Sequence, residues 1–211
     1  QGSYFFNRSA NANAQTTNRE TFLRGGEGNQ FYGENNTFAN TNLNHRVNFR
    51  LEYTLNKNNS FIFTPGASWQ NNTANTLRIG ATRLATEALL NRTNNTQMNE
   101  SSALNFTNNL LWRHRFAKAG RTLSVNLTAN INSRSGEGTL YALNEFFVAG
   151  RNPTDTIDQV AYTKSLNERW GASVNFTEPL TKLIQLQGNY NVSLSNSDSK
   201  NETFHFVNSE I

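Results

Sequence analysis

The chain has 211 residues, a formal net charge of +4 and only 16% charged residues. Asparagine makes up about one residue in six, and the mean hydropathy is −0.67. The 15 phenylalanines argue against disorder, because disordered segments are poor in aromatic residues. The composition therefore favours β structure whose polar positions are filled by Asn, Thr, Ser and Gln.

Several classes of protein are excluded at this level. The absence of cysteine rules out disulfides and thiolate metal sites. The sequence contains no run of about 18 apolar residues, the length that would predict a membrane-spanning helix. The positive charge is scattered and forms no dense basic block, so we expect no nucleic-acid partner. The opening residues 1–6 already read as strand, and we expect the chain to be a piece of a longer protein.

Alternation of apolar and polar residues predicts the strands, because successive side chains of a strand point to opposite faces. The first strand fades at about residue 22. The second rises from about residue 37 and ends in Leu43–Leu55, where apolar residues occupy the odd positions apart from His45. Five more are predicted at about 60–70, 104–116, 123–132, 170–176 and 184–194. Pro65 implies a bulge or an irregular end within the third.

Three tight turns are centred near Lys57, Ala119 and Leu180, at separations of 62 and 61 residues. Each interval holds two strands and one polar connection, which predicts short turns at one end of a sheet and long loops at the other. The expected long loops, which would carry substrate specificity, are at about 23–36, 71–99, 133–156 and 195–203. A short helical insertion is expected at 85–90.

Alternation alone also fits a soluble sandwich. The asymmetry of turns and loops, however, is typical of outer-membrane barrels. Aromatic residues also gather near the short turns, as in an interfacial girdle: Tyr53, Phe61, Phe63, Trp112, Phe116 and Phe176. The sequence thus predicts an all-β fold, an antiparallel meander of about seven long strands in which residues 1–211 form one segment of a large transmembrane β-barrel.

In such a barrel the odd positions of Leu43–Leu55 face lipid and the even positions face the lumen. Arg50 is then expected to pair with Glu52. The predicted lumen-facing polar residues are Arg46, Asn48, Arg50, Glu52, Arg113 and Arg115.

No residue set indicates catalysis, a cofactor or a metal, and we do not expect an enzyme. The three histidines (His45, His114 and His205) lie on separate predicted strands without helical metal-ligand spacing. Glu178 and Lys182 flank a predicted turn, and we expect both to be solvated there.

The segments Phe49–Asn56, His114–Ser124 and Phe176–Leu180 resemble the barrel of TonB-dependent outer-membrane receptors, especially the Asn-rich members from Bacteroidota. The resemblance extends over essentially the whole chain. It implies a cell outer-membrane location and active uptake of a bulky nutrient, such as a metal chelate, glycan or peptide. These receptors have a 22-stranded barrel, an N-terminal plug and a TonB box. Nothing here reads as a plug or box, so we expect residues 1–211 to be an internal part of the barrel without the plug domain.

The resemblance implies three partners: outer-membrane lipid, the TonB complex through a missing N-terminal part, and a surface lipoprotein. Two alternatives stay open. One is a small structural or adhesive outer-membrane β-barrel without active transport, and the other is a soluble binding β-sandwich.

Overall fold

The computed structural model describes residues 1–23, 28–147 and 151–206. Strands account for 86% of the described residues, and they form one antiparallel sheet. No helix among the described residues is long and apolar enough to cross a membrane. The strands are β1 (Gly2–Phe22), β2 (Asn29–Phe49), β3 (Leu51–Asn56), β4 (Asn59–Phe63), β5 (Gly66–Leu84), β6 (Leu89–Arg115), β7 (Thr122–Phe146), β8 (Thr154–Pro179) and β9 (Gln185–His205).

The nine strands occupy seven positions across the sheet, in the order β1-β2-β5-β6-β7-β8-β9. β3 continues β2 after a break at Arg50, and β4 leads into β5 across Thr64 and Pro65, which stand outside the ladder. β3 pairs with β4, and β4 with β6. The predicted antiparallel meander is confirmed, as is the irregularity at Pro65, since proline cannot donate to the ladder.

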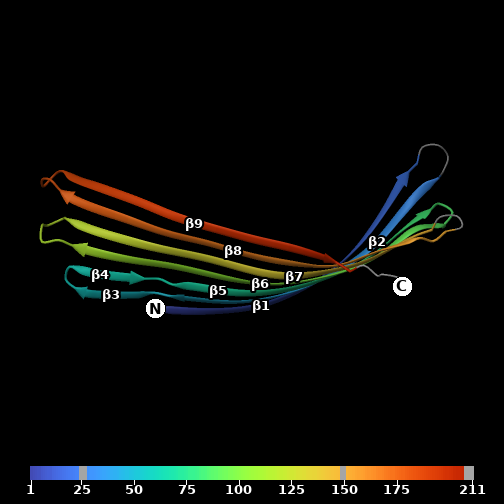
Figure 1. The fold of residues 1–211 in the computed structure, drawn as a ribbon, viewed down its shortest axis with the longest axis horizontal. Helices are drawn as coiled ribbons and strands as arrows, with labels where there is room; N and C mark the ends of the chain where they lie inside the picture. The colour runs from blue at the N-terminus through green and yellow to red at the C-terminus, as the bar shows by residue number, and fades with distance from the viewer. Residues whose placement is uncertain (24–27, 148–150, 207–211) are drawn as a thin grey trace.

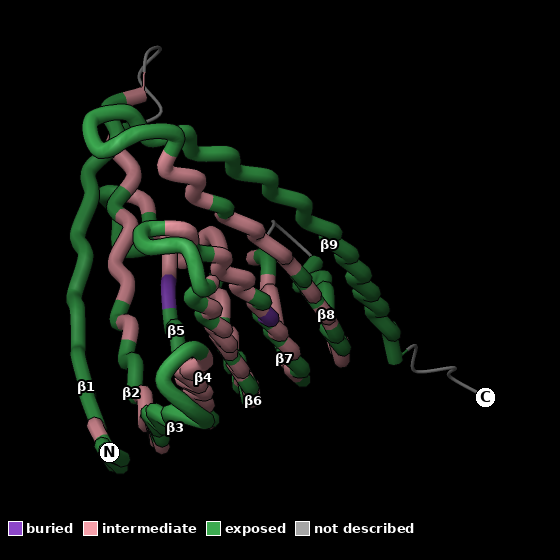
Figure 2. Tube along the Cα trace, turned by 90° about the vertical axis from the view of Figure 1, so that its left-hand side faces the viewer, coloured by how far each residue is buried: buried purple, intermediate pink, exposed green. Residues whose placement is uncertain are grey.

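Figure 1 shows the strands running lengthwise with their connections gathered at two ends. The connections β3–β4, β6–β7 and β8–β9 lie at one end, here called the Lys57 end, and those following β1, β5 and β7 lie at the far end. Figure 2 shows the sheet curving from β1 to β9 like an arch. The sheet is not closed into a barrel: β1 and β9 are its open edges, and both run from the Lys57 end to the far end.

The sheet is a single layer with little interior. Among the described residues only two hydrophobic side chains are buried, Ala129 at 6% and Ala142 at 4% exposure. Large apolar residues remain open, such as Leu194 at 71%. The described residues therefore do not form the two packed sheets that a sandwich requires.

The expectation of long loops is wrong. The range 71–99 belongs almost entirely to β5 and β6, the range 133–156 mostly to β7 and β8, and 195–203 to β9. β2 begins at Asn29 and not near residue 37, while residues 24–27 and 148–150 lie outside the described residues. The strands were missed because both of their faces are polar here, which hides the alternation. The backbone ladder needs no apolar face to satisfy its N–H and C=O groups.

The helical insertion predicted at 85–90 is also wrong. Residues 85–88 join β5 to β6 as a tight turn in which the Leu84 N–H donates to the Ala88 carbonyl oxygen at 2.9 Å. Glu87 takes a positive φ of 66°, which a right-handed α-helix does not allow. An isolated helix of six residues is too short to offset its nucleation cost, so the hairpin prevails.

Candidate functional site

One face of the sheet carries an apolar band near the Lys57 end. Directly opposed residues of a sheet point to the same face, so the pairing register assigns each side chain to one face. On β6, β7 and β9 the band covers Leu104–Trp112, Leu123–Ile131 and Leu186–Leu194, nine residues on each strand. About 9–11 residues of a tilted strand cross the hydrocarbon layer of a bilayer.

The far edge of this band runs diagonally across the sheet. The last apolar residues before the polar stretch are, from β9 to β2, Leu194, Trp170, Ile131, Leu104, Trp69 and Leu43. We compare each of these residues with the residue paired directly opposite it on the next strand. The edge shifts by two residues towards the far end between β8 and β7, between β7 and β6, and between β5 and β2, a total of six residues over five steps. With ~3.3 Å per residue and ~4.8 Å between strands, the edge makes an angle of about 40° with the hydrogen-bonding direction. Strands of membrane barrels tilt by roughly this amount, about 35–45°.

Aromatic residues line both edges of the band. The register and ring contacts place all six predicted girdle residues on the apolar face at the Lys57 end: Tyr53 and Trp112 both oppose Phe61, and the Phe116 and Phe176 rings meet edge to face at 6.1 Å. Sequence reasoning did not single out Trp69 and Trp170, which mark the far edge. Alternation assigns them to this face, but only the register shows that they stand at its border.

The polar positions within the band are packed among aromatic rings or left unpaired. His45 on β2 stacks on Trp69 at 5.5 Å and meets the Phe6 ring in a tilted contact at 4.9 Å, and its Nδ1 lies 2.8 Å from the Tyr4 hydroxyl. The side-chain Oδ1 of Asn108 is buried with no hydrogen-bond partner. Among the described residues, no group of three His, Asp or Glu side chains could hold a metal ion.

The opposite face is a network of amides and hydroxyls. Gln70 donates to Asn42 and Asn72 donates to Asn40, each at 2.7 Å, so that β5 is linked to β2 through side chains as well as through the backbone. An Asn side chain carries both a donor and an acceptor, which lets neighbouring strands share hydrogen bonds repeatedly. This explains why a chain so rich in asparagine forms a regular sheet.

The predicted lumen-facing residues share this polar face. The register places five of them there: Arg46, Asn48, Glu52, Arg113 and Arg115. The sixth, Arg50, lies at the break after β2, and its Nε donates to the Glu52 carboxylate at 2.7 Å. The predicted Arg50–Glu52 pair is confirmed, whereas the lumen itself stays a prediction.

A second polar cluster lies on this face at the far end. The Tyr32 hydroxyl donates to Glu34, whose carboxylate lies 3.6 Å from Arg78 Nε, and the Arg19 guanidinium stands 5.4 Å from the Tyr32 ring centre. The hydrogen bond to Glu34 raises the pKa of Tyr32. A Cβ on Gly80 would come within 2.8 Å of the Tyr32 hydroxyl, so only glycine leaves room for this arrangement.

An ion-pair cluster ties the end of β8 to the β6–β7 turn at the Lys57 border of the apolar band, where Glu178 opposes Leu186. Glu178 accepts from Lys118 Nζ at 2.6 Å and from Arg121 Nε at 2.5 Å, so the end of β8 is held to the β6–β7 turn. The expectation that Glu178 is merely solvated is wrong. Its side chain is 16% exposed, and the hydrogen bonds from Arg121 and Lys118 lower its pKa to about 2.

The Glu178 cluster predicts a pH-dependent contribution to stability. A carboxyl whose pKa falls on folding stabilises the folded state above its unfolded pKa, here about 4.5, and this contribution is lost as the pH falls towards about 2. We expect Glu178→Gln to be less stable than the parent protein at pH 7 and to approach it at pH 2. Urea unfolding at both pH values measures this difference, and a constant difference would contradict the assignment.

Comparisons with known proteins give no family. No protein-family model and no curated protein matches the sequence. Among solved structures, the siderophore receptor PiuA from Acinetobacter baumannii aligns over 96% of this chain and 46% of its own length, with 9% identity and a TM-score of 0.17. The chain thus spans less than half of that receptor, and a likeness at this level carries no argument about fold or function.

Proposed function

We propose that this chain is part of the wall of a large outer-membrane β-barrel that takes up a bulky nutrient, such as a metal chelate, glycan or peptide. The diagonal apolar band carries the proposal. Its length on β6, β7 and β9 matches the thickness of a bilayer core, and its slope matches the tilt of barrel strands. A soluble protein gains nothing from either feature.

The chemistry of the band supports contact with lipid. From β2 to β9, the described residues of the band include no Asp, Glu, Lys or Arg, and Glu178, which opposes Leu186 on this face, stands at the Lys57 border of the band. Its side chains are left open to solvent, with Leu127 at 45%, Trp170 at 50% and Val192 at 52% exposure. An uncovered apolar surface of this extent marks a membrane or protein contact. Lipid covers it evenly on every strand.

The two edges of the sheet favour a large barrel over a small self-closed one. β1 and β9 run in the same direction, so pairing them directly would create a parallel seam. Bacterial outer-membrane barrels are antiparallel throughout, with an even number of strands. An odd number of further strands between the two edges restores that pattern.

The polar face and the far end supply the transport surfaces of the proposal. The amide network lines a wet lumen, as in barrels that carry polar solutes. β6 continues 15 residues beyond the band, from Ala103 back to Leu89, which is about 50 Å of strand. We therefore assign nutrient capture to these projecting hairpins, and coupling to the TonB complex to no residue of this chain.

A deletion strain tests the proposal. We expect it to lose growth on one class of nutrient too large for general porins, and to grow normally on small sugars. We expect growth to be restored by complementation with the Asn130→Arg variant, which is altered on the polar face. We expect no restoration with the Leu127→Arg variant, which is altered in the band. Recovery of the native protein from the soluble fraction of lysed cells would overturn the proposal.

The projecting hairpins also suit a second function, a structural or adhesive outer-membrane barrel without active transport. Strands that extend far beyond a bilayer present a wide surface to other molecules. In that case the deletion strain grows normally on every nutrient and loses attachment to surfaces or to neighbouring cells.

A further inference from the structure

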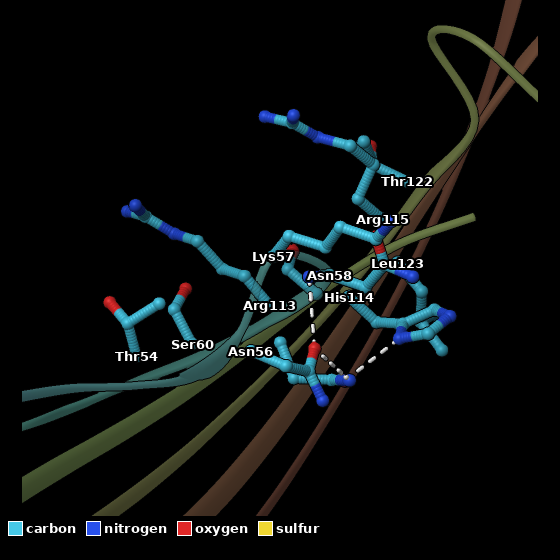
Figure 3. A pocket seen from close by; sticks show the side chains of 12 residues that line it. Thr54, Asn56, Lys57, Asn58, Ser60, Arg113, His114, Arg115, Thr122 and Leu123 are labelled. Carbon is cyan, nitrogen blue, oxygen red and sulfur yellow. Dashed lines mark hydrogen bonds between the residues drawn. The ribbon is translucent and has the colours of Figure 1, made fainter. Parts of the chain in front are cut away.

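A basic pocket lies on the polar face at the Lys57 end of the sheet. It encloses about 520 Å³ between the β3–β4 turn and the paired ends of β6 and β7. Figure 3 shows the side chains of Arg113 and Arg115 extending to the same side, with the Thr54 and Ser60 hydroxyls beside Arg113 and Thr122 beside Arg115. Lys57 adds a third cation from the turn, and no lining residue is acidic.

The turn that carries Lys57 is held in place by its neighbours. Asn56 Oδ1 accepts from the Asn58 N–H at 2.9 Å and from Asn59 Nδ2 at 3.0 Å. Asn59 Oδ1 in turn lies 2.8 Å from His114 Nδ1, and the Arg115 N–H donates to the Asn58 carbonyl oxygen at 2.8 Å. The wall of the pocket is therefore ordered before any ligand arrives, which lowers the entropy cost of binding.

The three cations of the pocket lack carboxylate partners. Among the described residues no ion pair involves Lys57, Arg113 or Arg115, and the nearby Glu52 is engaged by Arg50 at 2.5 Å. Arg113 and Arg115 are two residues apart on one face of β6, about 6.6 Å between their Cα atoms. Like charges at this distance repel one another, and an anion between them converts the repulsion into attraction.

We propose that this pocket binds a phosphate-class oxyanion carried by a solute. The forked guanidinium groups match the oxygens of a phosphate in a bidentate geometry, and the lysine contributes a point charge. The three hydroxyls supply further donors. The position of the site inside a lumen rests on the proposed function, whereas oxyanion binding itself does not.

Titration of the full-length chain in detergent micelles with inorganic phosphate, followed by ³¹P NMR at low salt, tests the proposal. We expect saturable binding that is weakened at least about tenfold per guanidinium lost in Arg113→Gln/Arg115→Gln. The double variant Arg113→Lys/Arg115→Lys keeps both positive charges but loses the forked guanidinium groups. We expect its affinity for phosphate to lie between those of the parent protein and of the double glutamine variant. Arg134→Gln removes an exposed polar-face arginine of β7 far from the pocket and is expected to leave binding unchanged.

A sugar phosphate serves as a second probe and distinguishes two sources of the ligand. Tighter binding than that of inorganic phosphate indicates a larger phosphorylated solute, and equal binding indicates the free ion. Two results would overturn the proposal: no saturable binding by the parent protein, or an equal loss of binding in Arg134→Gln, which would reveal a general attraction to positive charge. Phosphate binding that persists in a protein recovered from the soluble fraction would overturn only the lumenal position.

Discussion

Leu127→Arg is expected to cost about 2–4 kcal/mol of folding free energy in a lipid bilayer, because an arginine near the midplane of the lipid face must be desolvated. Leu127 lies at the centre of the band on β7, between Leu123 and Ile131, and is 45% exposed. Urea unfolding of the protein folded into lipid vesicles measures the cost, provided that the slope of the transition is unchanged.

The matched control for this substitution is Asn130→Arg. Asn130 lies three residues further along the same strand, on the polar face, and is exposed. An arginine there remains solvated in a wet lumen, so we expect a change within about 0.5 kcal/mol. Equal costs at the two positions would show that the two faces of β7 meet the same surroundings.

Asn108→Leu is expected to stabilise the protein by about 1–3 kcal/mol, the cost of leaving a buried polar group unsatisfied. Asn108 points to the apolar face opposite Ala129, within a hollow that is also lined by Leu110, Leu127 and Trp170, and its side-chain Oδ1 has no hydrogen-bond partner. A leucine removes the unpaired amide and fills part of the hollow. The same unfolding experiment in vesicles measures the gain.

Asn130→Leu serves as the control for this second prediction, because it adds the same side chain on the polar face. We expect no gain there, since the amide it removes is exposed to water. A loss of stability in Asn108→Leu would show instead that the Asn108 amide meets a polar partner, and that this part of the band does not face lipid.

The sequence predicted the fold wherever one face is apolar. In Leu43–Leu55 and Leu123–Ile131 the alternation is clear, and both segments are strands whose side chains fall on the predicted faces. It failed at Asn71–Asn99 because Asn, Thr and Ser occupy both faces there. The strands of this region follow from the pairing of β5 with β6, which no local pattern reveals.

The candidate sites depend on contacts between residues distant in the chain. Glu178 bonds with Arg121, 57 residues away, and the basic pocket joins Lys57 to Arg113 and Arg115 through the pairing of β4 with β6. Sequence reasoning selected these two arginines from their face alone. Their proximity to Lys57, and the place of Trp69 at the edge of the band, follow only from the register.

Quenching of intrinsic tryptophan fluorescence by brominated phospholipids tests the central claim, that the apolar face contacts lipid, most directly. The chain has three tryptophans, Trp69, Trp112 and Trp170, and all three stand on this face at an edge of the band. Because indole rings favour the interface, bromine near the headgroups is expected to quench strongly and bromine at the ends of the acyl chains weakly, with little quenching by aqueous acrylamide. Strong quenching by acrylamide and none by either lipid would contradict the account, since it would place these side chains in water.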